Sequence, residues 1–541
     1  MLINRRMPTT LMLSRSTRLR VASDHVVPDN DPVPLVTEMV VGTGPIKTIH
    51  SPGVLPPSLT RLTLDQNFEH VIMPRMMLPT IREMKYDTKM PLVRWSMPDQ
   101  LHTLILGNTF NQPITQNALP PALKVLTFGS SFSLPLFPGC FPASLETLTL
   151  SPAFNHPLKP GQLPPALTEL TYNTDLQLDI GVLPNTLITL NYGRTYDQDI
   201  IPGSLPNSLQ RLTFGMMFSR AFTQGVLPNS LTSLTTSVRY DRPFADLCLP
   251  PGLRFLTAGA SEDRSREAKP IRASDLPVSL TSLCLANTYQ HPLTRDTFPA
   301  TLQTLEIDPY DDQYKSDVFP SQLTKLTFSR FTSSILQPGM LPTSLTWLVF
   351  GMHYSRPIRA GVLPRSLTRL SLGYDFTPPS RDVVLSSGIR CLDLYRMRQI
   401  QYARMLLRPD ETIINITARY RASDMITTDC DLRFKQLNIP MHLDNPVAGY
   451  TWNKLVQDSM HYVSVMTRVI LARTYHASGN SDESSVHVRM IGMTTALCVL
   501  GATRPRQGQL IKIIDLSALK DHSDITLSST GLSEMNDWIG Q

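Results

Sequence analysis

A repeat of about 22 residues constrains the fold of this chain more than any other feature of its sequence. The dipeptide Leu-Pro, or a close variant of it, begins at Leu55, Leu78, Met97, Leu119, Phe141, Leu163, Leu183, Leu205, Leu227, Leu249, Leu276, Phe298, Phe319, Leu341 and Leu363. The fourteen intervals between these positions run from 19 to 27 residues, and nine of them equal 22. Unrelated turns in an ordinary β domain do not keep such a spacing, so the sequence indicates an array of one repeated unit.

Each unit reads Leu-Pro-x-Ser-Leu-x-x-Leu-Thr-Phe-Gly and continues to Phe-x-x-Pro-Ile, as in LPNSLQRLTFGMMFSRAF at 205–222. With the first residue of the dipeptide counted as offset 0, apolar residues occupy offsets 0, 4, 7, 9, 13 and 17. The alternation over the last residues of Leu-x-x-Leu-x-Phe predicts one short strand per unit. These few apolar residues cannot close a core alone, whereas stacked units share one.

The spacing Leu-x-x-Leu-x-Leu also matches the strand segment of leucine-rich repeats. Proline contributes 46 of 541 residues, which leaves little room for long helices because each proline removes a backbone donor. We therefore expect an α/β repeat solenoid that is leucine-rich-repeat-like, with about eighteen turns, one short parallel strand in each and mostly loop on the convex side. Proline at offset 1 predicts a tight corner, and glycine at offset 10, such as Gly215, predicts positive φ where the chain leaves the strand.

The second half of the unit carries a closer resemblance. Offsets 13–17 read FNQPI at 110–114, FNHPL at 154–158, YQHPL at 289–293 and YSRPI at 354–358. With the first half of the unit, this pattern resembles the FNIP repeat family of leucine-rich-repeat-like arrays, and the resemblance covers about residues 50–380. What it implies is a role in protein–protein interaction rather than in chemistry.

Three parts are expected along the chain. Residues 1–32 bear several arginines and few acids, which indicates a basic disordered tail, with a mitochondrial presequence as the alternative. Residues 33–424 form the solenoid, including degenerate turns near Val33, Leu385 and Arg408 that act as caps. Residues 425–541 lose the 22-residue period and form a small separate domain.

The strand pattern also predicts which residues face a partner. Offsets 7 and 9 point into the core, so offsets 6 and 8 point away from it. Offset 8 is threonine in eight units, which favours a structural ladder of β-branched residues. Offset 6 varies, and its candidates for a partner-binding face are Arg61, Arg211, Phe255, Lys325, Trp347 and Arg369. Trp347, flanked by Lys325 and Arg369 on neighbouring turns, is the expected hot spot, and Trp347→Ala should weaken binding without lowering the melting temperature.

Catalytic signatures are absent from the sequence. It contains no GxGxxG, no phosphate-binding loop and no HExxH, and His70 and His156 lie too many turns apart to share a metal. We predict a protein that is not an enzyme and has no catalytic residue, metal or cofactor. No apolar run is long enough for a membrane span, and six scattered cysteines without a CxxC pair indicate reduced thiols. A cytoplasmic location is favoured, with the nucleus and mitochondrion left open.

The carboxyl-terminal segment is expected to have the order β-α-β-α-β-β. Helices are predicted over 460–472 and 493–503, and strands near 452–456, 485–491, 510–516 and 525–527. This order, with Ser459–Val463 and Val486–Gly492, resembles the Alba family of nucleic-acid-binding domains. The resemblance implies RNA or DNA contact through Arg489, Arg504 and Arg506, although Met493 and Leu497 stand where the family has basic residues. The alternative is an unrelated α/β domain that caps the array or makes it dimeric.

Overall fold

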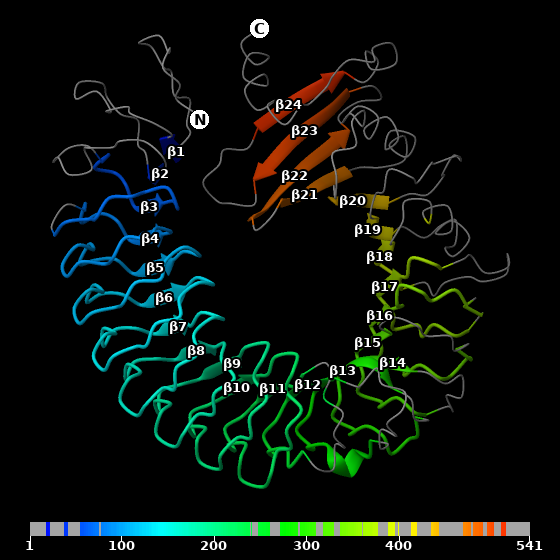
Figure 1. Cartoon of the computed structure of the whole chain (residues 1–541). Helices are drawn as coiled ribbons and strands as arrows, with labels where there is room; N and C mark the ends of the chain where they lie inside the picture. The colour runs from blue at the N-terminus through cyan, green and yellow to red at the C-terminus, as the bar shows by residue number, and fades with distance from the viewer. Residues whose placement is uncertain are drawn as a thin grey trace. The chain divides into compact units, whose positions relative to one another are not determined.

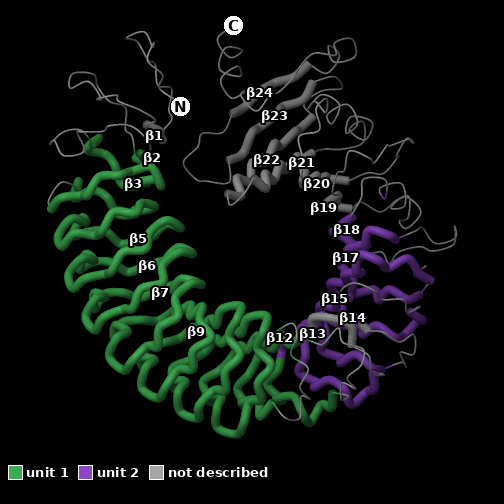
Figure 2. The backbone as a smooth tube through the Cα atoms, in the orientation of Figure 1, with its two compact units in different colours: residues 1–280 green, residues 281–541 purple. Residues whose placement is uncertain are grey.

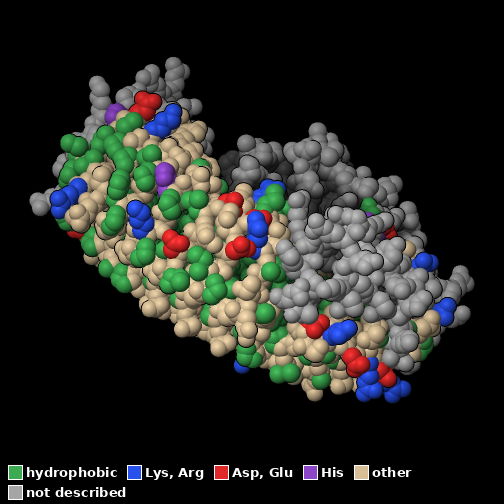
Figure 3. Space-filling model, turned by 60° about the horizontal axis from the view of Figure 1, so that its bottom comes forward, with side chains coloured by type: hydrophobic (Ala, Val, Ile, Leu, Met, Phe, Trp, Pro, Cys, Tyr) green, Lys and Arg blue, Asp and Glu red, His purple; other side chains and the backbone are tan. Residues whose placement is uncertain are grey.

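The computed structural model forms two compact units, residues 1–280 and 281–541, each built from stacked strands (Figure 2). Most of residues 37–399 are described with their side chains. The gaps in that range are 42–54, 75–76, 238–239, 241–246, 260–270, 290–292, 310–316, 329–335, 357, 360, 377–387 and 395–398. Within it, residues 286–289 and 309 are described by their backbone alone, and outside it the structure describes only the backbone of seven strands. The residues that are not described are grey in the space-filling view of Figure 3.

The first unit is a parallel sheet to which successive turns contribute one short strand each (Figure 1). Its strands are β1 (Arg18–Val21), β2 (Glu38–Val41), β3 (Arg61–Leu64), β4 (Glu83–Tyr86), β5 (Thr103–Leu106), β6 (Val125–Phe128), β7 (Thr147–Thr149), β8 (Glu169–Tyr172), β9 (Thr189–Tyr192), β10 (Arg211–Thr213), β11 (Ser233–Thr235) and β12 (Phe255–Gly259). Each strand pairs in parallel with the next one in the chain, so offset 6 of one turn lies beside offset 6 of the next, as Arg211 does beside Ser233. Helix is rare among the described residues, where η2 (Ala273–Asp275) is a 3-10 helix and Gln399 also has 3-10 geometry.

The second unit begins in the same way and ends differently. Its parallel strands are β13 (Ser282–Tyr289), β14 (Thr304–Pro309), β15 (Lys325–Phe328), β16 (Trp347–Val349), β17 (Arg369–Leu372), β18 (Cys391–Leu394), β19 (Ile413–Ala418), β20 (Phe434–His442) and β21 (Val469–Ala477). The strands β22 (Asn480–Met490), β23 (Thr495–Ala502) and β24 (Leu510–Asp515) then continue the sheet in antiparallel order. The expected leucine-rich-repeat-like solenoid of parallel strands is therefore confirmed, and the described residues contain almost no helix.

The buried apolar side chains of one repeat explain why the repeats stack on one another. Leu205, Leu209, Leu212, Phe214, Phe218 and Phe222, which hold the six predicted apolar offsets, are all at most 5% exposed. Rings at offset 13 stack on their equivalents in the next turn, with Phe110, Phe132 and Phe154 separated by 6.3 and 6.4 Å between centroids. A single turn has no second layer to cover these side chains, so each turn depends on its neighbours for its core.

Two corners bend the chain back toward the sheet. At the first, the amide of offset 4 donates to the carbonyl of the offset-1 proline, as Leu209 N does to Pro206 O at 3.0 Å, which confirms the predicted corner. The second corner is a four-residue turn that ends immediately before the next repeat. In Ile201–Ser204, Ser204 N donates to Ile201 O at 3.0 Å. Proline in the second place and Gly203 with φ of 84° in the third define a type II turn.

The prediction for the offset-10 glycines is wrong about their backbone. The glycines with positive φ lie two residues before each new unit, at Gly139, Gly161, Gly181, Gly203, Gly225, Gly339 and Gly361. The offset-10 glycines serve close packing instead, since a Cβ on Gly129 or Gly215 would overlap the backbone of the preceding turn. Both roles exclude a side chain, but only the first concerns dihedral angles.

Trp95 occupies the third place of the type II turn, where seven other repeats have a glycine with positive φ. Its φ is 64°, Ser96 N donates to Val93 O at 3.1 Å, and the ring is 52% exposed. We expect Trp95→Gly to raise the free energy of unfolding by about 1 kcal/mol, because a non-glycine residue is strained at this φ. The gain is reduced by the lost contact with Arg94, whose Cζ lies 5.0 Å from the ring centroid. Denaturant unfolding tests this, and a variant no more stable than the parent would contradict it.

The ends of the chain differ from expectation at two places. Residues 18–21, within the segment expected to be a disordered tail, form β1 and pair with β2. Residues 495–502, expected to be helical, form β23 between two antiparallel partners, β22 and β24. A short apolar run such as TALCVLGA fits a buried helix or a central strand equally well by periodicity, so the sheet neighbours decide.

Other predictions for this segment have mixed outcomes. The strands expected at 485–491 and 510–516 are confirmed as β22 and β24, whereas the last residues of the helix expected at 460–472 belong to β21. The segments 452–456 and 525–527 lie outside the described residues. The order β-α-β-α-β-β is therefore wrong at its second helix, and the domain boundaries at 33 and 425 stay predictions.

Candidate binding face

The outward-pointing residues of the parallel strands form what we call the recognition face, defined as offsets 6 and 8 of each 22-residue repeat. In β3, β6, β8, β9 and β17 the residues at offsets 7 and 9 are buried while those at 6 and 8 are exposed or half-buried. The predicted division between core and surface positions is therefore confirmed. Because neighbouring strands pair in register, residues of the same offset lie in rows across the strands within each compact unit.

The threonines at offset 8 form two such rows. Thr127, Thr149 and Thr171 are register partners on three successive strands, and Thr213, Thr235 and Thr257 repeat this further along. Asn191 separates the two runs, since it lies beside both Thr171 and Thr213. This arrangement agrees with the predicted structural ladder, which provides a regular polar background for the more varied offset-6 row.

In the first unit, three predicted residues lie at separate places on the recognition face. Arg61 forms an ion pair with Glu83 on the next strand, with Nε 2.6 Å from Oε2. Arg211 donates from Nε to Thr189 Oγ1 at 3.1 Å. Phe255 is 53% exposed. The sequence did not predict the Arg61–Glu83 pair. Glu83 lies five residues after Leu78 instead of six, so it was not among the offset-6 residues, although it pairs with Arg61 in the sheet.

In the second unit, the structure brings Lys325, Trp347 and Arg369 together. They are register partners on β15, β16 and β17. Lys325 Nζ lies 4.0 Å from the centroid of the Trp347 ring, and Arg369 Cζ lies 4.3 Å from it. A cation within about 6 Å of an indole ring is attracted by its negative face, so two such contacts hold all three side chains in place.

Arg369 has a further partner that sequence reasoning missed. Its Nε donates to Asp393 Oδ2 at 2.8 Å, and Ser371 Oγ donates to the same oxygen at 2.9 Å. Asp393 lies at offset 8 of the degenerate turn that begins at Leu385. Extending the offset list into that turn would have found it. The Asp393 carboxylate fixes the orientation of the Arg369 guanidinium. The two terminal nitrogens of the guanidinium remain available for another acceptor.

The indole nitrogen of Trp347 completes the description of this cluster. Nε1 is buried and has no hydrogen-bond partner within the described part of the chain. A buried donor without an acceptor is uncommon in folded proteins and requires an explanation. The cluster is therefore more than an exposed aromatic residue on a strand, because it combines an unpaired donor with two fixed cations.

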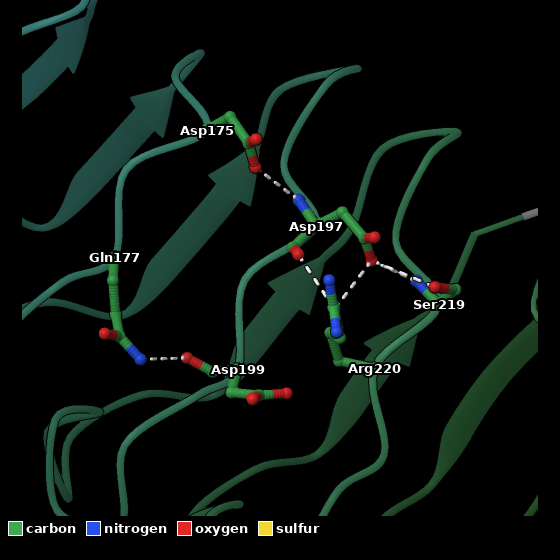
Figure 4. Close-up of polar contacts among 6 residues, drawn as sticks. All are labelled: Asp175, Gln177, Asp197, Asp199, Ser219 and Arg220. Atoms are coloured by element: carbon green, nitrogen blue, oxygen red, sulfur yellow. Dashed lines mark hydrogen bonds and ion pairs between the residues drawn. The ribbon is translucent and has the colours of Figure 1, made fainter.

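Acidic side chains on the loops after the strands have a structural role (Figure 4). Asp175 Oδ1 accepts from Asp197 N at 2.8 Å, and Asp197 Oδ1 accepts from Ser219 N at 2.8 Å, so each carboxylate contacts the backbone one turn ahead. Arg220 adds a contact from Nε to Asp197 O at 2.9 Å. These acids stabilise the stacking of loops and do not converge as a catalytic pair would.

Thiols and histidines of the described residues give no catalytic constellation. Burial, with the carboxylate of Glu306 nearby, raises the pKa of Cys284 to about 12, which keeps this thiol protonated at neutral pH. His156 Nε2 lies 2.8 Å from Ser133 O, and His70 packs edge-on against Phe68. No group of three or more potential metal ligands occurs in the residues that were described. That the chain is not an enzyme stays a prediction.

The nucleic-acid residues are not tested by the structure. Arg489 lies in β22 opposite Leu497, with its side chain outside the description, and Arg504 and Arg506 lie outside the described residues. RNA or DNA binding and dimerisation through this segment stay predictions. Within the described part of the chain, no helix has the length and apolar character needed to cross a bilayer.

Comparison with known proteins gives one family match and several similar folds. The family model described as "FNIP Repeat" matches residues 90–131, 110–153, 132–175, 154–191, 172–216, 218–260, 269–309, 289–331 and 333–375, which together span just over half of the chain. A solved structure described as CroV588, "a novel circular LRR protein structure", is 23% identical with a TM-score of 0.49 and covers 75% of this chain and 69% of its own. YopM from Yersinia enterocolitica is 18% identical with a TM-score of 0.32, covering 77% of this chain and 85% of its own. No curated protein sequence matches.

Proposed function

Since the chain belongs to the FNIP repeat family, we propose that it is a non-enzymatic scaffold that binds a protein partner through its recognition face. The observation that carries the proposal is the in-register cluster of Lys325, Trp347 and Arg369. Offset 6 needs no particular side chain for stacking, because the core is built from other offsets. Tryptophan and arginine at such a position are the residue types that dominate binding hot spots.

Phe255 supports the same proposal in the first unit. Its ring is 53% exposed at offset 6 of β12, where the preceding and following repeats have Ser233 and Ser282. An exposed aromatic ring contributes nothing to the core beneath the strand. A partner that covers the ring would remove most of the ring's apolar area from water, which favours binding. The row of threonines beside it supplies hydroxyl groups that donate or accept hydrogen bonds from a partner backbone.

The structure changes what is expected of Trp347→Ala. The ring is half-buried and makes two cation–π contacts, so its removal lowers the free energy of unfolding by about 1–2 kcal/mol. The melting temperature is therefore expected to fall modestly, in contrast to the unchanged value predicted from the sequence. A binding test that relies on Trp347 alone would confuse the two effects, and Phe255→Ala removes this ambiguity.

We expect Phe255→Ala and Trp347→Ala each to reduce partner capture about tenfold or more, because truncating a hot-spot aromatic residue has this effect. The measurement is affinity purification of the tagged full-length chain with quantitative mass spectrometry of what is retained. The matched control is Ile180→Ala, which removes an apolar side chain that is 61% exposed in the turn before Leu183 and does not belong to offset 6 or 8. Partners retained equally by both aromatic variants and by the control would contradict the proposal.

A further inference from the structure

We propose that Lys325, Trp347 and Arg369 form an acid clamp, a site that binds a carboxylate side chain of an acidic segment in the protein partner. The inference rests on the proposed function and adds the chemical class of the partner. Three donor groups carry it: the Lys325 ammonium, the Trp347 indole N–H and the terminal nitrogens of the Arg369 guanidinium. They come from one offset on three successive strands.

The cations of the clamp are held in place before any ligand arrives. A free lysine or arginine on a surface loses rotamer entropy when it binds. Here the indole ring lies between the two cations, at 4.0 Å from one and 4.3 Å from the other, and the backbone register fixes their separation. An anion therefore meets two ordered positive groups, which lowers the entropic cost of binding.

The charges around the clamp leave one cation unopposed. Lys325 has the Trp347 ring as its contact and no carboxylate within ion-pair distance among the described residues. Arg369 shares Asp393 with Ser371 through Nε, which leaves its terminal nitrogens for a second acceptor. Of the two acids on the neighbouring strand β14, Glu306 lies beside Thr327 and contacts Cys284, and Asp308 is buried. An incoming carboxylate would compensate Lys325 and supply an acceptor for the unpaired indole N–H.

The position of the two cations over the Trp347 ring favours an acidic peptide over a nucleic acid as the ligand. Proteins that bind single-stranded nucleic acid stack bases on exposed aromatic faces. Both faces of Trp347 are covered by Lys325 and Arg369, so a base has no ring to stack on. A carboxylate needs only the cations and the ring edge. The indole N–H is buried, so the two cations make the first contacts with the carboxylate.

The test uses the full-length chain and a fluorescein-labelled hexaglutamate peptide, with binding followed by fluorescence anisotropy. We expect saturable binding that weakens as salt is raised, and no binding of hexaglutamine. Lys325→Gln and Arg369→Gln should each weaken binding about fivefold to tenfold, as expected for a lost charge-assisted contact. Trp347→Phe keeps a ring between the cations but removes the N–H, and should weaken it by a smaller factor. The control is Arg365→Gln, which removes the same charge from an exposed turn.

Several outcomes would overturn the clamp. If Arg365→Gln weakens binding as much as Lys325→Gln and Arg369→Gln do, hexaglutamate binding depends only on the net charge of the protein. Displacement by equimolar inorganic phosphate would indicate a general anion site, and tighter binding of hexauridylate that Lys325→Gln abolishes would indicate a nucleic-acid site. If hexaglutamate fails to bind while Phe255→Ala still reduces partner capture, the clamp is wrong and the proposed scaffold function stands. If neither effect is seen, both proposals fall.

Discussion

Replacing Phe218 by Ala is expected to lower the free energy of unfolding of the first unit by about 3–5 kcal/mol. The Phe218 ring is fully buried at offset 13 and lies 3.9 Å from the Phe214 ring and 5.4 Å from the Phe222 ring between centroids. It also stacks on Tyr196 and Tyr240 of the adjacent turns, at 6.2 Å from each. The rigid sheet on one side and the neighbouring turns on the other prevent the cavity from collapsing.

The measurement for Phe218→Ala should be local, because a long repeat array does not always unfold in one step. Hydrogen exchange of β9, β10 and β11 reports the turns that contact the cavity directly, and guanidinium chloride unfolding reports the global change. The matched control is Met217→Ala, one residue away, with a side chain that is 43% exposed, where a change within about 0.5 kcal/mol is expected. Similar losses for both variants would contradict the role assigned to the ring stack.

Such a cavity would also affect the recognition face at a distance from any partner contact. In a solenoid, each turn contacts its neighbours alone, so destabilisation spreads along the stack rather than through a common core. Arg211 at offset 6 and Phe218 at offset 13 belong to the same turn. A change at the buried offset would therefore loosen the strand that presents the outward residue.

The repeat pattern predicts most of the array because each level of the structure follows from one spacing. The apolar offsets define the core, the alternation defines the strand, and the register then follows, since every turn has about the same length. That is why Lys325, Trp347 and Arg369 could be placed side by side from their common offset, as β15, β16 and β17 confirm. A single irregular unit is enough to break this reasoning, as Glu83 shows.

Contacts between side chains could not be predicted in the same way. Offset counting places Trp347 between two basic residues, but it does not show that their cations lie on its faces or that Asp393 orients Arg369. Beyond the array, where the period ends, the sequence offers only local periodicity. The sequence predicts a helix where β23 lies, because a short apolar run fits a buried helix and a central strand equally well, and only the pairing with β22 and β24 decides.

Gly215→Ala is expected to destabilise the first unit by about 3 kcal/mol, well above the effect of an ordinary glycine substitution. A Cβ at this position would overlap the carbonyl oxygen of Gly193, the equivalent glycine of the preceding turn. Backbone atoms cannot move aside as a flexible side chain would, so the two loops must separate. Loops that separate after the strand also pull adjacent strands out of register.

Gly203→Ala separates this packing effect from backbone strain. Gly203 has φ of 84°, and a Cβ there would have nothing within 4 Å, so strain alone should lower the free energy of unfolding by about 1 kcal/mol. Parallel denaturant unfolding of the two variants gives the comparison. A larger loss for Gly203→Ala than for Gly215→Ala would mean that dihedral freedom, as first predicted for offset 10, matters more than close approach. The opposite order would show that the close approach of successive loops, backbone to backbone, stabilises the first unit more than dihedral freedom does.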